Sequence, residues 1–213
     1  FLHSFAPFIT RRTNDQIFIS GCYSKSNIKL IGSDPGIAAA YNGGTHMPFE
    51  DISVFRAFPE MTILDVCDTT QIADLTRQLA KLYGMYYVRM VRKNMVQVYE
   101  PGSTFEIGKG NVLRDGRDVT IIAAGLMVSR ALDAADLLEK KGVQARVVDM
   151  FTIKPLDKQA VIDAAKTGRV VAAQDHNLLG GLGQLVGSCI AEAGIACKLV
   201  SRGCPDYFVP IAN

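Results

Sequence analysis

Short apolar, β-branched runs alternate with segments of helical spacing along most of this chain. Several runs are almost continuously apolar, which is typical of strands buried on both faces of a sheet. The runs span residues 28–33, 62–66, 86–91, 119–125, 145–151, 169–175 and 198–203. Their length and composition predict seven parallel strands.

The segments between the later runs repeat apolar residues at three- and four-residue spacing. In the first of them, Ile72, Leu75 and Leu79 fall on one helical face. The predicted helices span residues 71–84, 129–142, 156–168 and 182–194, and each segment ends in glycine, a common helix stop. Alternation of strand and helix predicts parallel α/β layers with right-handed crossovers.

A break in this pattern falls at residues 99–118, YEPGSTFEIGKGNVLRDGRD, which are rich in glycine and poor in apolar periodicity. Such segments connect structural units. We therefore predict an α/β protein with two parallel-sheet, three-layer domains at 1–105 and 118–213, joined by a linker at 106–117. The first unit has few strands for its length, so we expect sequence upstream of Phe1 to complete it.

Composition narrows the function classes. The chain has 23 basic and 21 acidic side chains, and its densest basic cluster is only Arg89, Arg92 and Lys93, so we predict no nucleic-acid partner. No apolar run approaches the roughly 18 residues of a membrane span, so we predict no membrane partner either. The five cysteines are scattered, without a Cys-x-x-Cys pair, which favours reduced thiols in a cytoplasmic protein without a zinc site.

The stretch NGGTHMPFED at 42–51 contains His46, one of three histidines in the chain. Gly43 and Gly44 permit a close backbone approach to a ligand, and Thr45 can orient the imidazole. Loops at the ends of parallel strands are where α/β proteins bind ligands. On local grounds alone, a passive loop histidine is still the favoured interpretation.

Two further motifs leave alternatives open. In VRMVRKN, Arg92 is either a phosphate ligand through its bidentate fork or a solvated strand-edge residue. GGLG at 180–183 follows a predicted strand, but its glycine spacing departs from G-x-G-x-x-G, so tight helix–strand packing is favoured over a dinucleotide site. His176, next to that loop, is predicted to be a contact or capping residue.

Taken together and in order, these segments resemble the C-terminal half of a transketolase over essentially the whole chain. SFAPFITRRTNDQI is similar to the aromatic stretch around the aminopyrimidine ring of thiamine diphosphate. IKLIGSDPGIAAAYNGGTHMPFEDI is similar to the segment that carries the family's substrate-binding histidine, and YYVRMVRKN to the strand with its phosphate-binding arginine. RDVTIIAAGLMVSRALDAADLLEKKGVQARVVDMFTIKPLD and VVAAQDHNLLGGLG are similar to its C-terminal domain.

The resemblance implies roles for particular residues. Phe5 would stack on the aminopyrimidine ring, and Phe8 would line the same pocket. His46 would lie over the thiazolium carbon and hydrogen-bond to the sugar hydroxyls as a catalytic acid–base group. Arg92 would bind the distal phosphate of the sugar.

The chain also departs from the family pattern. Asp34 replaces a histidine in the substrate site, where an acid would repel a phosphate. Asn42 replaces an acidic residue that recognises a sugar hydroxyl, and it can still hydrogen-bond without charge. Met47 replaces a glutamine, and Arg11 replaces a pocket aromatic. These changes predict an altered ketose or an altered phosphate length.

Two parts of the family's catalytic apparatus are outside the sequence given. The glutamate that activates the cofactor would precede Phe1, and the chain has no Gly-Asp-Gly motif of a diphosphate and metal site. The resemblance therefore implies thiamine diphosphate and Mg²⁺ bound mainly by a partner, a diphosphate-binding N-terminal transketolase subunit. It also implies a homodimer through the C-terminal half, a heterotetramer with the partner, and an inactive chain in isolation.

The leading hypothesis is thus the C-terminal subunit of a split transketolase, which transfers a two-carbon ketol unit between sugar phosphates. A related thiamine enzyme is one alternative, either a deoxyxylulose-phosphate synthase or the beta subunit of a 2-oxo-acid dehydrogenase. A non-catalytic assembly module is the second alternative, and a nicotinamide-binding oxidoreductase that uses GGLG is the weakest.

Overall fold

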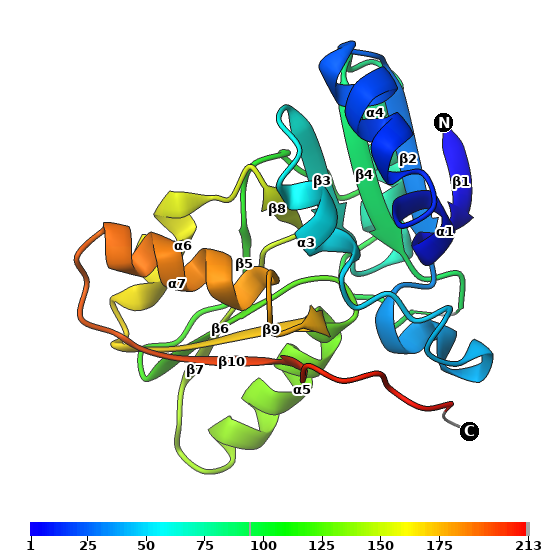
Figure 1. Cartoon of the computed structure of the whole chain (residues 1–213). Coiled ribbons are helices and arrows are strands. Elements are labelled where there is room, and N and C mark those ends of the chain that lie inside the picture. The colour runs from blue at the N-terminus through cyan, green and yellow to red at the C-terminus, as the bar shows by residue number, and fades with distance from the viewer. Residues whose placement is uncertain (94, 212–213) are drawn as a thin grey trace.

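The computed structural model describes residues 1–93 and 95–211, which form two five-stranded sheets with helices on both faces (Figure 1). The first sheet has the order β1 (Leu2–Phe5), β2 (Ile28–Ser33), β4 (Met85–Met90), β3 (Met61–Asp65) and β8 (Thr152–Lys154). The second has the order β10 (Lys198–Cys204), β9 (Arg169–Asn177), β6 (Val119–Ala123), β7 (Ala145–Asp149) and β5 (Asn111–Arg114). The predicted α/β class with parallel-dominated sheets is confirmed.

Each sheet carries one antiparallel edge strand that the sequence did not predict. Strand β5 pairs antiparallel with β7, within the stretch 106–117 predicted as a linker. Strand β8 lies in the later half of the chain but pairs antiparallel with β3 of the first sheet. The other pairs in both sheets are parallel.

Side-chain alternation along the central strands explains the layers of the first sheet. On β3 and β4, Ile63 and Tyr87 point into a core shared with α1 (Ala6–Thr10), a π-helix η1 (Ile17–Tyr23) and α3 (Asp51–Arg56). Their neighbours Leu64 and Val88 point to the other face, where α4 (Thr69–Leu79) packs. Because both faces of these strands are buried, their sequences are nearly continuously apolar.

In the second sheet, α5 (Met127–Glu139) covers one face, and α6 (Lys158–Ala165) and α7 (Leu182–Glu192) cover the other (Figure 1). Helix α6 begins with an Asp157 cap, whose carboxylate accepts a hydrogen bond from the Ala160 amide. The largest cluster of buried apolar side chains runs from Leu30 and Ile63 in the first sheet to Ile122 and Val170 in the second. The two sheets therefore share a continuous core.

The four predicted helices are present with ends shifted by a few residues. The short elements before residue 60 were not predicted: β1, α1, α2 (Asn14–Gln16), η1, the 3₁₀ helix η2 (Gly36–Asn42) and α3. None of the helices described is long and apolar enough to cross a membrane.

Candidate functional site

The loop that carries His46 begins with a glycine turn. Gly43 has a φ of 77°, a conformation that glycine adopts at no steric cost, and its carbonyl accepts a hydrogen bond from the His46 amide at 2.9 Å. The Thr45 hydroxyl lies 2.9 Å from Nδ1 of His46. Since that contact occupies Nδ1, Nε2 is the ring nitrogen that remains for a ligand. The structure thus shows the orientation by Thr45 that the sequence indicated.

The structure brings Phe5, Phe8 and His46 together. Phe5 ends β1, Phe8 lies one turn later in α1, and the two ring centroids are 6.0 Å apart. The His46 ring is 5.1 Å from Phe8 and 6.0 Å from Phe5, with edge-to-face geometry in both pairs. All three side chains are half-buried. The two phenyl rings and the His46 imidazole thus form one aromatic surface.

Arg92 extends this cluster at the end of β4. Its guanidinium lies over the Phe5 ring, with Cζ 4.3 Å from the centroid. Its Nε donates to Oδ2 of Asp34 at 2.5 Å, and its backbone amide donates to Oδ1 of the same carboxylate at 2.9 Å. Asp34 is buried, whereas half of the Arg92 side chain is exposed. Two of the four residues predicted to bind substrate, Asp34 and Arg92, are therefore bonded to each other.

Asn42 ends η2 on the surface, one residue before the glycine turn. No side-chain hydrogen bond of Asn42 is seen among the described residues. Its neighbour Tyr41 is also exposed and lies under Lys93, whose Nζ is 4.4 Å from the ring centroid. Asn42 therefore borders the loop but is not part of the aromatic cluster.

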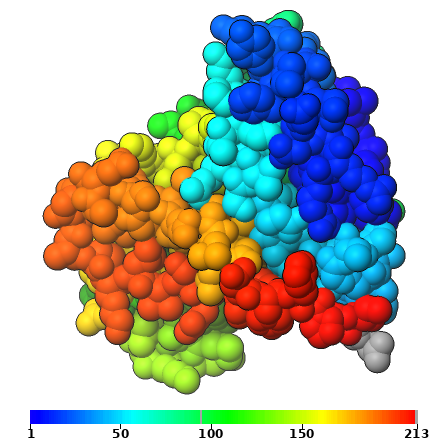
Figure 2. All heavy atoms as spheres, in the orientation of Figure 1, coloured from blue at the N-terminus to red at the C-terminus, as the bar shows by residue number. Residues whose placement is uncertain are grey.

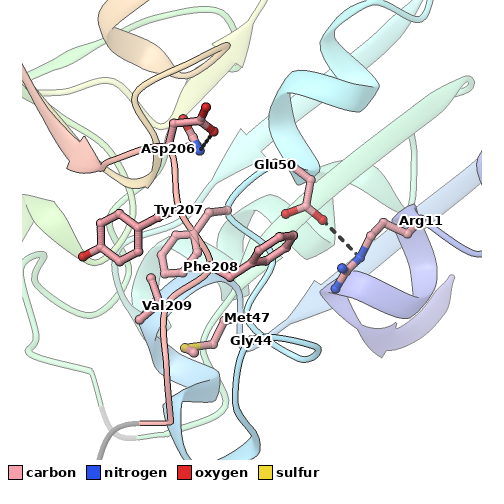
Figure 3. A pocket seen from close by; sticks show the side chains of 10 residues that line it. Arg11, Gly44, Met47, Glu50, Asp206, Tyr207, Phe208 and Val209 are labelled. Carbon is pink, nitrogen blue, oxygen red and sulfur yellow. Dashed lines mark hydrogen bonds and ion pairs between the residues drawn. The ribbon is translucent and has the colours of Figure 1, made fainter.

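A cavity with a volume of about 560 Å³ lies beside the His46 loop (Figure 3). Arg11 and Glu50 form an ion pair on one side of it, with Nε and Oε1 3.1 Å apart, and Arg11 also donates to the Thr45 carbonyl. Tyr207, Phe208 and Val209 line another side, and in Figure 2 the red C-terminal segment lies against the light-blue part of the chain. The other lining residues are Gly44, Met47, Phe49, Asn177 and Asp206. His46, Phe5 and Phe8 are not among them.

The structure contains a buried charge network, centred on Arg89, that the sequence analysis did not predict. Arg89 is 1% exposed; its Nε donates to Asp51 at 2.7 Å and its Nη1 to Asp65 at 2.9 Å. Its Nη2 donates to the carbonyl of Asp175 on β9, so one side chain links both sheets. Tyr87 completes the network with a 2.6 Å hydrogen bond to Asp51. Arg89 lies on β4 and Arg92 two residues after its end, and the two side chains pair with different carboxylates.

His176 belongs to the same buried region. It is 1% exposed, its Nδ1 lies 2.8 Å from the Asn177 carbonyl, and its Nε2 lies 3.9 Å from Asp51. Burial lowers the pKa of His176 to about 4, so its ring is neutral at physiological pH. These contacts agree with the predicted role as a contact residue.

The GGLG segment packs closely against β10 and α3 of the same chain. A Cβ on Gly183 would lie 2.3 Å from Oγ of Ser201, and one on Gly187 would lie 3.2 Å from Leu199. The Gly180 carbonyl accepts a hydrogen bond from Arg56 of α3 at 2.6 Å. These contacts support the packing explanation for the glycines.

The sequence analysis also missed a buried acid outside this network, Asp149. Asp149 at the end of β7 accepts hydrogen bonds through Oδ2 from Gln71 at 2.8 Å and Tyr99 at 2.7 Å, and Cys67 lies 3.8 Å away. Its Oδ1 has no hydrogen-bond partner among the described residues. Burial raises the pKa of Asp149 to about 7.

Within the described ranges, no three His, Cys, Asp or Glu side chains are grouped so that they could hold a metal ion.

Comparison with known proteins matches both halves of the chain to family models. Residues 1–97 match the transketolase pyrimidine binding domain, and residues 108–213 match the transketolase C-terminal domain. A 6-deoxy-6-sulfo-D-fructose transketolase subunit from Clostridium sp. (strain MSTE9) is 42% identical over 90% of this chain and 60% of its own length. An apulose-4-phosphate transketolase subunit from Phocaeicola vulgatus is 39% identical over 98% of this chain and 67% of its own length.

A solved structure described as a split gene transketolase in an inactive beta4 tetramer has the same fold. It superposes with a TM-score of 0.90 at 36% identity, over 97% of this chain and 66% of that one. The chain thus spans about three fifths to two thirds of the length of these relatives.

Proposed function

This chain belongs to the transketolase family, and from that premise we propose that it supplies the pyrimidine-binding and C-terminal parts of a split transketolase. The complete enzyme would transfer a two-carbon ketol unit between sugar phosphates or sugars of related structure. The observation that carries the proposal is the cluster of Phe5, Phe8 and His46, with Arg92 held against it. The cluster brings together an apolar ring surface at the end of β1 and in α1, a proton-transfer group on the His46 loop, and a cation just after β4.

The aromatic cluster fits the pyrimidine part of thiamine diphosphate. Phe5 and Phe8 present half-buried rings, which can hold a flat heterocycle by stacking and edge contacts. Because Arg92 lies over the Phe5 ring, a heterocycle that stacks on Phe5 would use the opposite face. When bound, thiamine diphosphate supplies the carbanion chemistry that breaks and forms the carbon–carbon bond.

His46 is the acid–base group of the proposal. With Nδ1 held by Thr45, Nε2 can donate a hydrogen bond to a sugar hydroxyl or accept a proton from it. Asn42 at the loop entrance is proposed to offer an uncharged hydrogen bond to the sugar.

Arg92 is proposed to hold the distal end of the sugar. Its Nε is bound to Asp34, while its terminal nitrogens Nη1 and Nη2 are the donors available for a ligand. The two relatives are named for different distal groups, a sulfonate and a phosphate. Family membership therefore leaves this group open.

We also propose a partner subunit that carries the diphosphate and Mg²⁺ site. Support comes from the relatives, which are named as transketolase subunits, and from the solved structure of the same fold, which is described as a split gene transketolase. A homodimer through the C-terminal half, a heterotetramer with the partner and a cytoplasmic location complete the proposal.

Reconstitution tests this function. The chain is mixed with a candidate diphosphate-binding chain, thiamine diphosphate and Mg²⁺, and ketol transfer is followed with a panel of ketose donors and aldose acceptors. We expect activity from the mixture and none from either chain alone. A stable complex that neither binds thiamine diphosphate nor transfers a ketol unit from any donor would favour the non-catalytic assembly module instead.

A further inference from the structure

Asp34 is placed where it controls the charge of the proposed distal-group site. It follows β2 directly and has a φ of 51°, a left-handed conformation that aspartate, asparagine and histidine adopt more readily than other non-glycine residues. Its side chain is 4% exposed, and its carboxylate accepts from both the backbone amide and Nε of Arg92. The acid is therefore fixed by the backbone and by two hydrogen bonds, not drawn in by a chance surface contact.

Arg92 is held on three sides by this arrangement. Asp34 binds its inner edge, the Phe5 ring lies under its plane, and the backbone bond fixes the start of its side chain. Such a guanidinium has lost most of its rotational freedom, so a ligand that binds its outer edge does not have to order it. Asp34 thus preorganises Arg92 for hydrogen bonding by Nη1 and Nη2.

The same carboxylate cancels the charge of the guanidinium. The pair has a net charge of zero, and an anion bound to the outer edge of Arg92 would lie within several ångströms of the Asp34 carboxylate. Repulsion from that carboxylate is proportional to the charge of the anion, so a phosphate dianion meets twice the repulsion of a singly charged group. Burial of Asp34 reduces the screening of this repulsion by solvent.

We propose that Asp34 is a specificity-determining residue that selects sugars with a hydroxyl or a singly charged acid at the distal end over sugars with a phosphate dianion. This inference rests on the proposed role of Arg92 as the distal-group ligand. It narrows the substrate class of the same site, because the Asp34–Arg92 pair keeps the hydrogen-bond donors but removes the net positive charge.

The test uses Asp34→Asn, which keeps the left-handed conformation and the size of the side chain but removes its charge. In the reconstituted enzyme, kcat/KM is measured for a phosphorylated sugar and for its unphosphorylated counterpart. We expect the ratio of the two values to rise by about tenfold or more in favour of the phosphate. A ratio within twofold of the wild-type value would overturn the proposal.

Asp136→Asn is the matched control, because Asp136 pairs with Arg114 on the surface at the same 2.5 Å separation. It should leave the ratio unchanged. If Asp34→Asn does not fold, Asp34→His provides a second variant with the same backbone tolerance.

A binding measurement on the full chain alone separates this inference from the proposed function. The Nε–H resonance of Arg92 is followed by NMR during titration with inorganic phosphate and with methanesulfonate at pH 8. We expect the wild type to bind phosphate no more tightly than the sulfonate, and Asp34→Asn to bind phosphate about tenfold more tightly. Equal changes for both anions would refute the role of Asp34, whereas a failed reconstitution would refute only the proposed enzyme.

Discussion

Replacing Arg89 with methionine should destabilise the protein severely. The substitution removes the cation between Asp51 and Asp65 while keeping a side chain of similar length, and all three positions are buried. Breaking a buried ion pair by removing one partner costs about 3–5 kcal/mol, because the charge left behind has lost both its counterion and its water. Two carboxylates are left here, so we expect a loss in the upper part of that range.

The destabilisation by Arg89→Met should depend on pH, because Asp65 can take up a proton. Burial already raises the pKa of Asp65 above its ordinary value, and loss of the Arg89 cation would raise it further. Above about pH 4 the folded variant then binds more protons than the unfolded chain, so its stability falls as pH rises. The stability gap between wild type and Arg89→Met should therefore be smaller at pH 5 than at pH 8.

Urea denaturation at both pH values measures the effect. Arg130→Met is the control, because Arg130 pairs with Asp133 on the surface of α5 and should lose at most about 1 kcal/mol. Adding Asp51→Asn and Asp65→Asn to Arg89→Met should recover part of the loss by removing the unpaired charges. A loss below about 1 kcal/mol at pH 8, or a gap that does not change with pH, would refute the account of the network.

Three further predictions concern the site and the sheets. His46→Ala should lower turnover of the reconstituted enzyme about 100-fold, as loss of an acid–base group does. The control His3→Ala on β1 should leave turnover unchanged. Equal turnover of His46→Ala and the wild type would mean that His46 is a passive loop residue. Gly116→Ala should cost about 1–3 kcal/mol in urea denaturation, because its Cβ would lie 2.4 Å from the backbone of Ala145, and an unchanged midpoint would contradict that clash. The pKa of Asp149, raised to about 7 by burial, should make stability fall as pH rises from about 4 to about 7, and Asp149→Asn should flatten that slope.

The strands and helices with clear periodicity could be predicted because local pattern and burial agree in them. Residues 28–33 are a strand buried on both faces, and α4 carries Leu75 and Leu79 on its core face, as their spacing indicated. Strand β8 could not be predicted, since three residues have no period and its partner is almost ninety positions earlier in the chain.

The site was predicted unevenly for a similar reason. The family resemblance pointed to Phe5, Phe8 and His46, and the structure brings them together. The pairing of Asp34 with Arg92 was not foreseen, because a sequence gives the charge of an acid but not the atom it bonds. The departure from the family pattern at Asp34 was the available signal, and by itself it indicates only repulsion.

Strand β8 connects the two halves of the chain by pairing with β3, and this affects how the protein can be produced. It completes the edge of the first sheet with backbone from the second half, and the large core continues beneath it. A protease that cut between β4 and β5 would therefore produce two pieces that stay associated and elute as one species. Expressed alone, the first piece would expose the unpaired edge of β3, which is a template for aggregation. The halves are best produced as one chain, or together in one cell.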